Sequence, residues 1–145
     1  MYLLEINMTH CLQDKTITGL EIAEDKEAIR FLIEGDDPII AKCDADCCSH
    51  TWVEHIELPA MGFPAKVLGI EEIDLPGSAD NHPDHDCLQV YGTKITTDKG
   101  DIVIDYRNSS NGYYGGSLSW PHEDDRFYGG VWGQNISKEE WKQVS

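Results

Sequence analysis

The side chains best suited to chemistry lie in two short clusters of cysteine, histidine and aspartate. Residues 43–50 read Cys-Asp-Ala-Asp-Cys-Cys-Ser-His, and residues 82–87 read His-Pro-Asp-His-Asp-Cys. Thiolates and imidazoles are zinc ligands, and a thiolate is also a nucleophile. These clusters therefore raise two possibilities, a metal site and a cysteine active site.

A metal site would draw its ligands from both clusters, namely from Cys47, Cys48, His50, His85 and Cys87. The spacing departs from structural zinc patterns, because no Cys-x-x-Cys pair occurs and two adjacent cysteines do not easily turn toward one tetrahedral ion. Zinc binding is therefore an alternative hypothesis, and the leading interpretation needs no cofactor.

A cysteine active site would use Cys47 or Cys48, which directly precede a segment with helical spacing. Trp52, Val53 and Ile56 recur at that spacing in residues 49–57, which also contain a capping-box pattern. A thiol at the N-terminus of a helix lies in the positive end of the helix dipole, which stabilises its thiolate. The sequence thus predicts a short helix after Cys48.

Residues 46–49, Asp-Cys-Cys-Ser, resemble the Asp-Cys-Ser-Gly start of NlpC/P60-type cysteine peptidases, in which a histidine on a later strand acts as the base. The resemblance implies His85 in that role, because it lies just before the strand-like residues 88–91. The chain departs from that family in having two adjacent cysteines and in having Ser-His in place of Ser-Gly. A cysteine hydrolase is therefore a second alternative.

Most elements that would position these side chains are predicted strands. β-Branched and apolar residues dominate residues 15–24 and 29–34, and the turn sequence Gly-Asp-Asp-Pro then precedes residues 39–41. This pattern predicts a hairpin between the second and third strands. Residues 65–75 form a further strand-like run.

The second half of the chain predicts a longer antiparallel arrangement. Residues 88–97 and 101–107 flank the turn Asp98-Lys99-Gly100, which predicts a hairpin. The dipeptide Asn111-Gly112 suits a tight turn into residues 113–120, so we expect three consecutive antiparallel strands.

Near the C-terminus, Ser137 and Glu140 have the spacing of a capping box, which predicts a short helix docked by Trp141. The predicted fold class is α+β, mainly an antiparallel sheet with one helix after Cys48 and another at the C-terminus. At 145 residues, the whole chain 1–145 is expected to form a single domain.

The charge of the chain restricts the class of partner. The sequence contains 27 Asp and Glu against 11 Lys and Arg, for a formal net charge of -16. A field of this sign repels phosphate backbones and anionic lipid, which argues against nucleic acid and membranes and favours a protein with a basic surface. The sequence has no signal-peptide or membrane-spanning pattern and an odd number of cysteines, which indicates a cytoplasmic protein with free thiols.

Two groups of residues are candidates for contacting such a partner. The acidic group lies within residues 71–86, which contain no Lys or Arg, and the aromatic group lies in the Gly- and Tyr-rich residues that follow the hairpin. Carboxylates attract a basic surface, and exposed tyrosines serve as anchors in interfaces. A solvated loop and tyrosines packed between strands are the simpler explanations. The candidates are Glu71, Glu72, Asp74, Asp80, Asp84, Asp86, Tyr113 and Tyr114.

Several strings together look like an uncharacterised family of small phage and prophage proteins. They are Asp-Cys-Cys-Ser at 46–49 with Trp52 after it, residues 97–100, and Arg-Asn-Ser-Ser-Asn-Gly-Tyr-Tyr-Gly-Gly at 107–116. The resemblance covers residues 19–116 and implies a phage or prophage origin, with action in the cytoplasm of a host cell.

The leading hypothesis is therefore a non-enzymatic acidic protein that binds and inhibits or modulates a host protein. A compact surface rich in carboxylates can be attracted to a basic groove and compete there with nucleic acid. This mimicry of DNA charge suggests a nucleic-acid-handling or defence protein as the partner.

Overall fold

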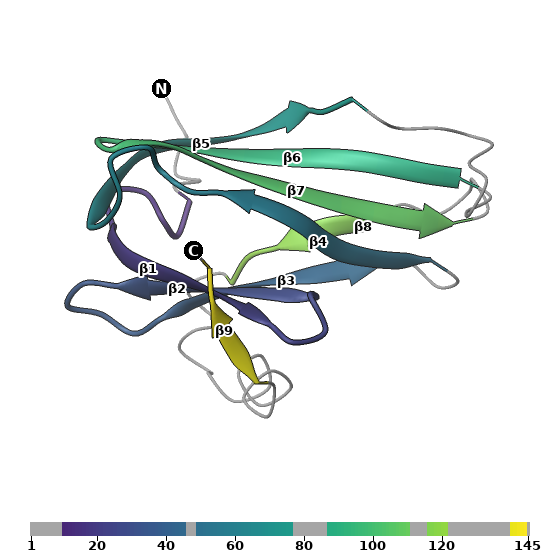
Figure 1. Ribbon diagram of the computed structural model, residues 1–145, viewed down its shortest axis with the longest axis horizontal. Coiled ribbons are helices and arrows are strands. Elements are labelled where there is room, and N and C mark those ends of the chain that lie inside the picture. Colours follow the sequence, from purple (N-terminus) through teal and green to yellow (C-terminus); the bar gives the residue numbers. More distant parts are fainter. Residues whose placement is uncertain (1–9, 46–48, 77–86, 111–115, 122–139, 145) are drawn as a thin grey trace, which may run out of the picture.

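Strands make up all the regular secondary structure in the described part of the chain (Figure 1). The computed structural model describes residues 10–45, 49–76, 87–110, 116–121 and 140–144. The strands are β1 (Thr16–Ala23), β2 (Ala28–Ile33), β3 (Ile39–Ala45), β4 (His50–Glu57), β5 (Ala65–Asp74), β6 (Cys87–Thr97), β7 (Gly100–Ser110), β8 (Gly116–Ser119) and β9 (Trp141–Gln143). The fold is all-β, so the predicted α+β class is wrong.

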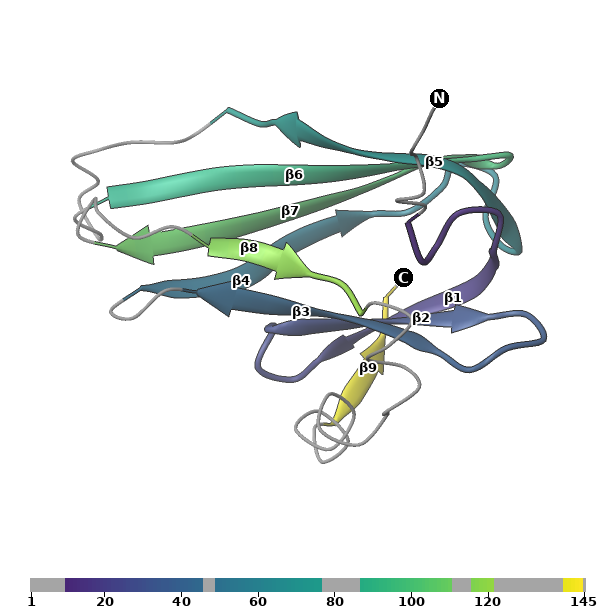
Figure 2. The ribbon, with the colours of Figure 1, turned by 180° about the vertical axis from the view of Figure 1, so that it is seen from behind.

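The strands form one continuous antiparallel sheet that folds over into two layers (Figures 1 and 2). The strand order is β4-β7-β6-β5-β1-β2-β3-β8, with β9 paired to β1. Only two residue pairs join β1 to β5, Thr16 with Lys66 and Ile17 with Ala65. The sheet changes layers at this short junction. One layer consists of β4, β7, β6 and β5, and the other consists of β1, β2, β3 and β8.

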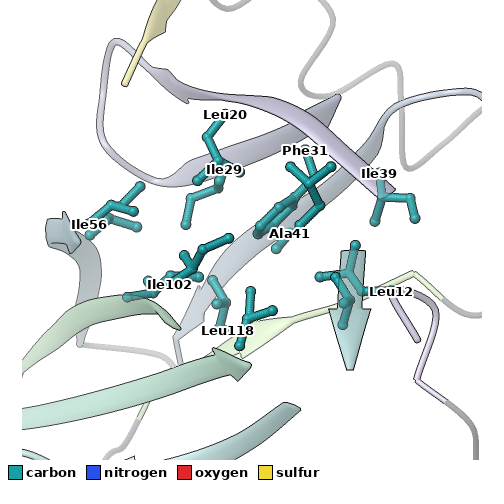
Figure 3. Close-up of a cluster of buried hydrophobic side chains, with 14 of the residues drawn as sticks. Leu12, Leu20, Ile29, Phe31, Ile39, Ala41, Ile56, Ile102 and Leu118 are labelled. Carbon is teal, nitrogen blue, oxygen red and sulfur yellow. The ribbon is translucent and has the colours of Figure 1, made fainter. Parts of the chain in front are cut away.

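The hydrophobic core lies between the two layers (Figure 3). Leu20, Ile29 and Phe31 of the β1–β2 hairpin are fully buried, and Ile102 of β7 and Leu118 of β8 lie across from them. Because successive side chains of a strand point to opposite faces, alternate residues of each strand supply this core. Each side chain of this size stabilises the fold by about 1.5–3 kcal/mol when fully buried.

The predicted strands of the first half are confirmed with small shifts at their ends. The runs at 15–24 and 29–34 become β1 and β2, and the run at 65–75 becomes β5. β2 pairs with β3 from Phe31 opposite Ile39 to Ala28 opposite Lys42, which confirms the predicted hairpin. The local alternation of apolar residues was therefore a sufficient signal for these elements.

The predicted hairpin between β6 and β7 is also confirmed. The strands pair without a break from Thr97 opposite Gly100 to Cys87 opposite Ser110. Gly100 has a φ of 118°, and a Cβ there would lie 2.9 Å from the backbone nitrogen of Ala60. This turn therefore requires a glycine, both for its backbone conformation and for the close approach of the neighbouring loop.

The predicted helix after Cys48 is wrong, because residues 50–57 form the strand β4. A β-bulge between Val53 and His55 adds one residue to β4, so Val53 and Ile56 both face the core although they are three positions apart. This spacing imitates that of a helix. The helix dipole invoked to activate Cys47 or Cys48 is therefore absent, since a strand begins at His50.

The third strand of the second half exists but pairs differently from the prediction. β8 pairs with β3, from Lys42 opposite Ser119 to Ala45 opposite Gly116, rather than with β7. Both edges of β7 are already taken by β6 and β4. The chain after β7 therefore crosses to the other layer.

The predicted C-terminal helix is wrong at Trp141, which begins the strand β9. This strand pairs with the end of β1, Trp141 lying opposite Ala23 and Gln143 opposite Glu21. The Arg30 guanidinium lies 4.5 Å from the centroid of the Trp141 ring, so Trp141 does dock the C-terminal segment as expected. Residues 137–139 of the predicted helix lie outside the described residues. No helix long and apolar enough to cross a bilayer occurs in the described ranges.

Candidate functional site

The three described members of the predicted acidic group lie together at the far end of β5. Glu72 is opposite Thr93 and Asp74 is opposite Tyr91, so Glu72 and Asp74 face the interior side of their layer, while Glu71 faces the outer side. All three residues are exposed. We call Glu71, Glu72 and Asp74 the acidic edge.

The Glu72 carboxylate is held by two hydroxyl groups from neighbouring strands. The Tyr106 hydroxyl donates to Oε1 and the Thr93 hydroxyl donates to Oε2, each at 2.8 Å. Thr93 is fully buried and Tyr106 is 4% exposed. Hydrogen bonds to a carboxylate are stronger than those between neutral groups, so these two hydroxyl groups fix the position of the Glu72 side chain.

Burial raises the pKa of the Tyr106 hydroxyl above its ordinary value of 10.0, and the hydrogen bond to Glu72 raises it further. Tyr106 therefore keeps its proton at neutral pH and remains a donor to Glu72. The same change makes it a poor general acid or base near pH 7. The ring of Tyr91 stacks on that of Tyr106 with centroids 5.2 Å apart, which fixes both rings.

The Glu71 carboxylate, by contrast, has a weaker partner on the outer side of the layer. Lys94 Nζ lies 3.6 Å from its Oε1, and the Glu71 side chain is 63% exposed. An exposed pair at this distance contributes little stability and is readily exchanged. The acidic edge thus presents one fixed carboxylate and two adaptable ones.

A second polar network lies on the same inner face, one step along β7. The Thr51 hydroxyl donates to Asn108 Oδ1 at 2.8 Å, and Asn108 Nδ2 donates to Gln89 Oε1 at 3.1 Å. A Cβ on Gly116 would clash with the Thr51 hydroxyl and lie 2.9 Å from Asn108 Oδ1. These buried polar groups join β4, β7 and β6 beneath β8, so we assign Asn108 a structural role.

Cys43 of the first cysteine cluster is not an activated thiol. Burial and the nearby carboxylates of Glu27 and Asp25 raise the pKa of Cys43 to about 12, so its thiol stays protonated at neutral pH. Cys47, Cys48 and His85, the nucleophile and base of the hydrolase hypothesis, lie outside the described residues.

The structure does not bring the two described residues of the zinc hypothesis together. His50 is opposite Ser109 on β7, and Cys87 is opposite Ser110. Since adjacent residues of β7 point to opposite faces, His50 and Cys87 point away from each other. Instead, His50 Nε2 lies 3.3 Å from Glu27 Oε2. The described ranges contain no group of three His, Cys, Asp or Glu side chains that could hold a metal.

The remaining predicted contact residues, Asp80, Asp84, Asp86, Tyr113 and Tyr114, lie outside the described residues. The strand ends that flank their segments are described, and they meet at one end of the sheet. Cys87 at the start of β6 pairs with Ser110 at the end of β7. The acidic edge lies on β5, which runs toward the end of the sheet where Cys87 and Ser110 pair.

Sequence reasoning missed the residues that position Glu72. Thr93 and Tyr106 lie 21 and 34 residues further along the chain. A usable signal was present, because a tyrosine and a threonine interrupt the inward-facing apolar positions of β6 and β7. Only the strand register, however, shows that both side chains reach one carboxylate.

Comparisons with known proteins place this arrangement in a family. The model of the Domain of unknown function (DUF7448) matches residues 11–120. The "Uncharacterized protein L278" of Acanthamoeba polyphaga mimivirus is 32% identical over 127 residues, which cover 77% of this chain and 96% of that protein. No solved structure matches the chain. The chain, with its folded-over sheet and the acidic edge within the matched region, belongs to the DUF7448 family.

Proposed function

We propose that this domain is a non-enzymatic viral binding protein that recognises a positively charged surface of a host protein and so inhibits or modulates that protein. The similarity to a mimivirus protein supports a viral origin, and a phage or prophage origin is part of the proposal. The partner class follows from the net charge of -16.

One observation carries the proposal, namely that exposed carboxylates outnumber the basic side chains that pair with them among the described residues. Lys15, Arg30, Lys94 and Arg107 each form an ion pair within the molecule. Many exposed carboxylates of the described ranges form none of these ion pairs, among them Glu24, Asp25, Glu34, Asp37, Glu57, Asp74 and Asp101. Their field attracts a basic surface.

The action on the partner follows from the same field. A basic groove that binds nucleic acid attracts phosphate charges, and carboxylates on a compact surface compete for the same groove. A host protein that handles nucleic acid, including a defence protein, is therefore the class of target we propose. Binding should block the groove without any chemical step.

Affinity capture from a host lysate tests this function. The immobilised domain should retain a partner in stoichiometric amount at about 0.05 M salt and release it at about 0.5 M, because the Debye length shortens. Double-stranded DNA added to the low-salt wash should displace the same partner. Absence of any retained partner at low salt, or retention that ignores both salt and DNA, would contradict the proposal.

A further inference from the structure

The outer edge of β5 is free over most of its length among the described residues. β1 pairs with β5 only at Lys66 and Ala65, and the chain before β1 then covers the next groups: Val67 donates its N–H to the Lys15 carbonyl, and the Gln13 amide donates to the Leu68 carbonyl. Beyond Leu68, no described residue pairs with this edge. In Figures 1 and 2, β5 forms the outer margin of its layer.

This free edge is long enough to accept another strand. Residues 69–74 extend over roughly 20 Å, the length of an ordinary strand. Their other side is firmly paired with β6, from Gly69 opposite Thr96 to Asp74 opposite Tyr91. Ile73 and Leu75 also pack closely on Gly92, where a Cβ would lie 2.8 Å from Ile73 Cγ1. The edge therefore presents backbone donors and acceptors on a rigid support.

The charges along the edge select the strand that can bind there. Glu71 lies on one face of β5, and Glu72 and Asp74 lie on the other, so a strand added at this edge meets carboxylates on both faces. Charged residues on an edge strand normally prevent strand addition. An incoming strand of like charge is repelled, and a neutral strand would bury the carboxylates without a partner. A strand with Lys or Arg side chains instead pairs with these carboxylates.

A second copy of this chain is a poor occupant for the same reason. Pairing of two β5 edges would place Glu71, Glu72 and Asp74 of one copy against the same carboxylates of the other, and like charges directly across a sheet destabilise it. The net charge of -16 on each copy adds to this repulsion.

We propose that residues 69–74 of β5 form a strand-addition site that binds an extended, Lys- or Arg-bearing segment of the partner protein. The proposal rests on the proposed function and specifies its contact. Backbone hydrogen bonds to the β5 edge supply affinity, and the acidic edge supplies the selection for basic side chains. Glu72, already held by Tyr106 and Thr93, requires no reorganisation to accept an ammonium or guanidinium group.

The test uses the wild-type domain and a synthetic peptide of about eight residues in which Lys and Thr alternate. Binding should shift the backbone amide resonances of residues 69–74 in ¹⁵N spectra and slow their hydrogen exchange. A peptide of identical charge, N-methylated at alternate backbone nitrogens, cannot form the ladder and should bind at least about tenfold more weakly. Equal binding of the two peptides would overturn strand addition while leaving the charge-based function intact.

A pair of matched variants tests the acidic edge. Glu71→Gln, Glu72→Gln and Asp74→Asn together should weaken peptide binding by about tenfold or more, because each removes a charge-assisted contact. The control changes Glu24→Gln, Glu34→Gln and Asp37→Asn, which removes the same number of charges elsewhere, and should weaken binding by no more than about threefold. Equal losses in the two triple variants would overturn the site. If the edge variant does not fold, the comparison of the two peptides on the wild-type domain still tests whether β5 binds by strand addition.

The lysate capture separates this site from the general function. A host partner that is captured in a salt-sensitive manner but leaves the amides of residues 69–74 unprotected would overturn the strand-addition site and keep the proposed function. If neither the partner nor the basic peptide binds at about 0.05 M salt, both proposals fail.

Discussion

The outer edges of β1 and β5 differ in how they are protected, although the two strands are neighbours in one sheet. The edge of β1 is covered, at its start by β5 and at its end by β9, with Trp141 packed against Arg30. The edge of β5 past Leu68 has no strand over it in the described ranges and carries carboxylates instead. An edge that is covered by a strand cannot pair with any further strand. An edge that carries carboxylates disfavours only strands that are negatively charged or neutral.

The largest expected effect comes from uncovering the β1 edge. Trp141→Ala removes the ring that packs on Arg30, Ala23 and Ala28, and should lower the free energy of unfolding by about 2–4 kcal/mol. Amide hydrogen exchange at Ile22 and Glu24 should accelerate, because their N–H groups face β9: Glu24 donates to the Glu140 carbonyl, and Ile22 is the next residue on that side, opposite Lys142. Chemical denaturation and exchange measured by NMR check both.

Trp141→Phe is the control for this change. The indole Nε1 is buried and has no hydrogen-bond partner among the described residues, so phenylalanine keeps an aromatic ring and loses no hydrogen bond seen there. The free energy of unfolding of Trp141→Phe should fall by less than half of the loss expected for Trp141→Ala. Unchanged exchange at Ile22 and Glu24 in Trp141→Ala would show that β9 does not protect the β1 edge.

The next effect concerns the support of the β5 edge. Gly92→Ala places a Cβ within 2.8–3.0 Å of Ile73 and Leu75 side-chain atoms, which forces them away from β6 and should cost about 1–3 kcal/mol. Thermal unfolding measures the loss. Gly69→Ala on β5 is the control, because no described atom lies within 4 Å of the added Cβ. A Gly92→Ala variant as stable as Gly69→Ala would contradict the close packing of this edge.

A somewhat smaller effect comes from releasing Glu72. Tyr106→Phe removes a hydroxyl that donates to Glu72 and should reduce stability by about 1–2 kcal/mol at neutral pH. Tyr91→Phe keeps the stacked ring and serves as the control. Binding of the Lys-Thr peptide should weaken in Tyr106→Phe. An unaltered affinity would show that the fixed position of the Glu72 carboxylate does not contribute to peptide binding.

Tyr106 also predicts how stability depends on pH. Folding raises its pKa above 10.0, so from about pH 10 upward the unfolded chain loses this proton while the folded domain keeps it. The stabilisation is fully present below pH 10 and is lost as the pH rises toward the pKa of the folded state. Urea unfolding at several alkaline pH values should show a steeper loss in the wild type than in Tyr106→Phe; equal slopes would contradict it.

The smallest effect concerns the cation beside the acidic edge. Lys94→Gln removes the partner of Glu71 and should change stability by less than about 0.5 kcal/mol, because the pair is exposed. The same variant should bind the Lys-Thr peptide about twofold more tightly, since one competing cation is gone. Titration calorimetry at low salt measures this. Weaker binding would show that Lys94 contributes directly to the contact.

The fold was predictable where the signal was local, and the site was predictable only in part. The hairpins β2–β3 and β6–β7 followed from alternation and turn residues, such as the Gly100 turn. The helix predicted after Cys48 failed because the bulge in β4 shifted the phase of an ordinary strand. Glu71, Glu72 and Asp74 were identified from composition, but the hydroxyl groups that hold Glu72 were not.

By itself, the sequence determined the net charge, the positions of most strands and the turns that join adjacent ones, because side-chain alternation and turn conformation depend on neighbouring residues. Tertiary structure alone decided that β8 crosses to β3, that β9 covers β1, and that β5 leaves β1 after two residue pairs. These pairings depend on which edges remain available once the layers pack, which is a long-range condition. The acidic residues of β5 acquire an edge that no described residue covers, and with it the binding mode that we propose, only at that level.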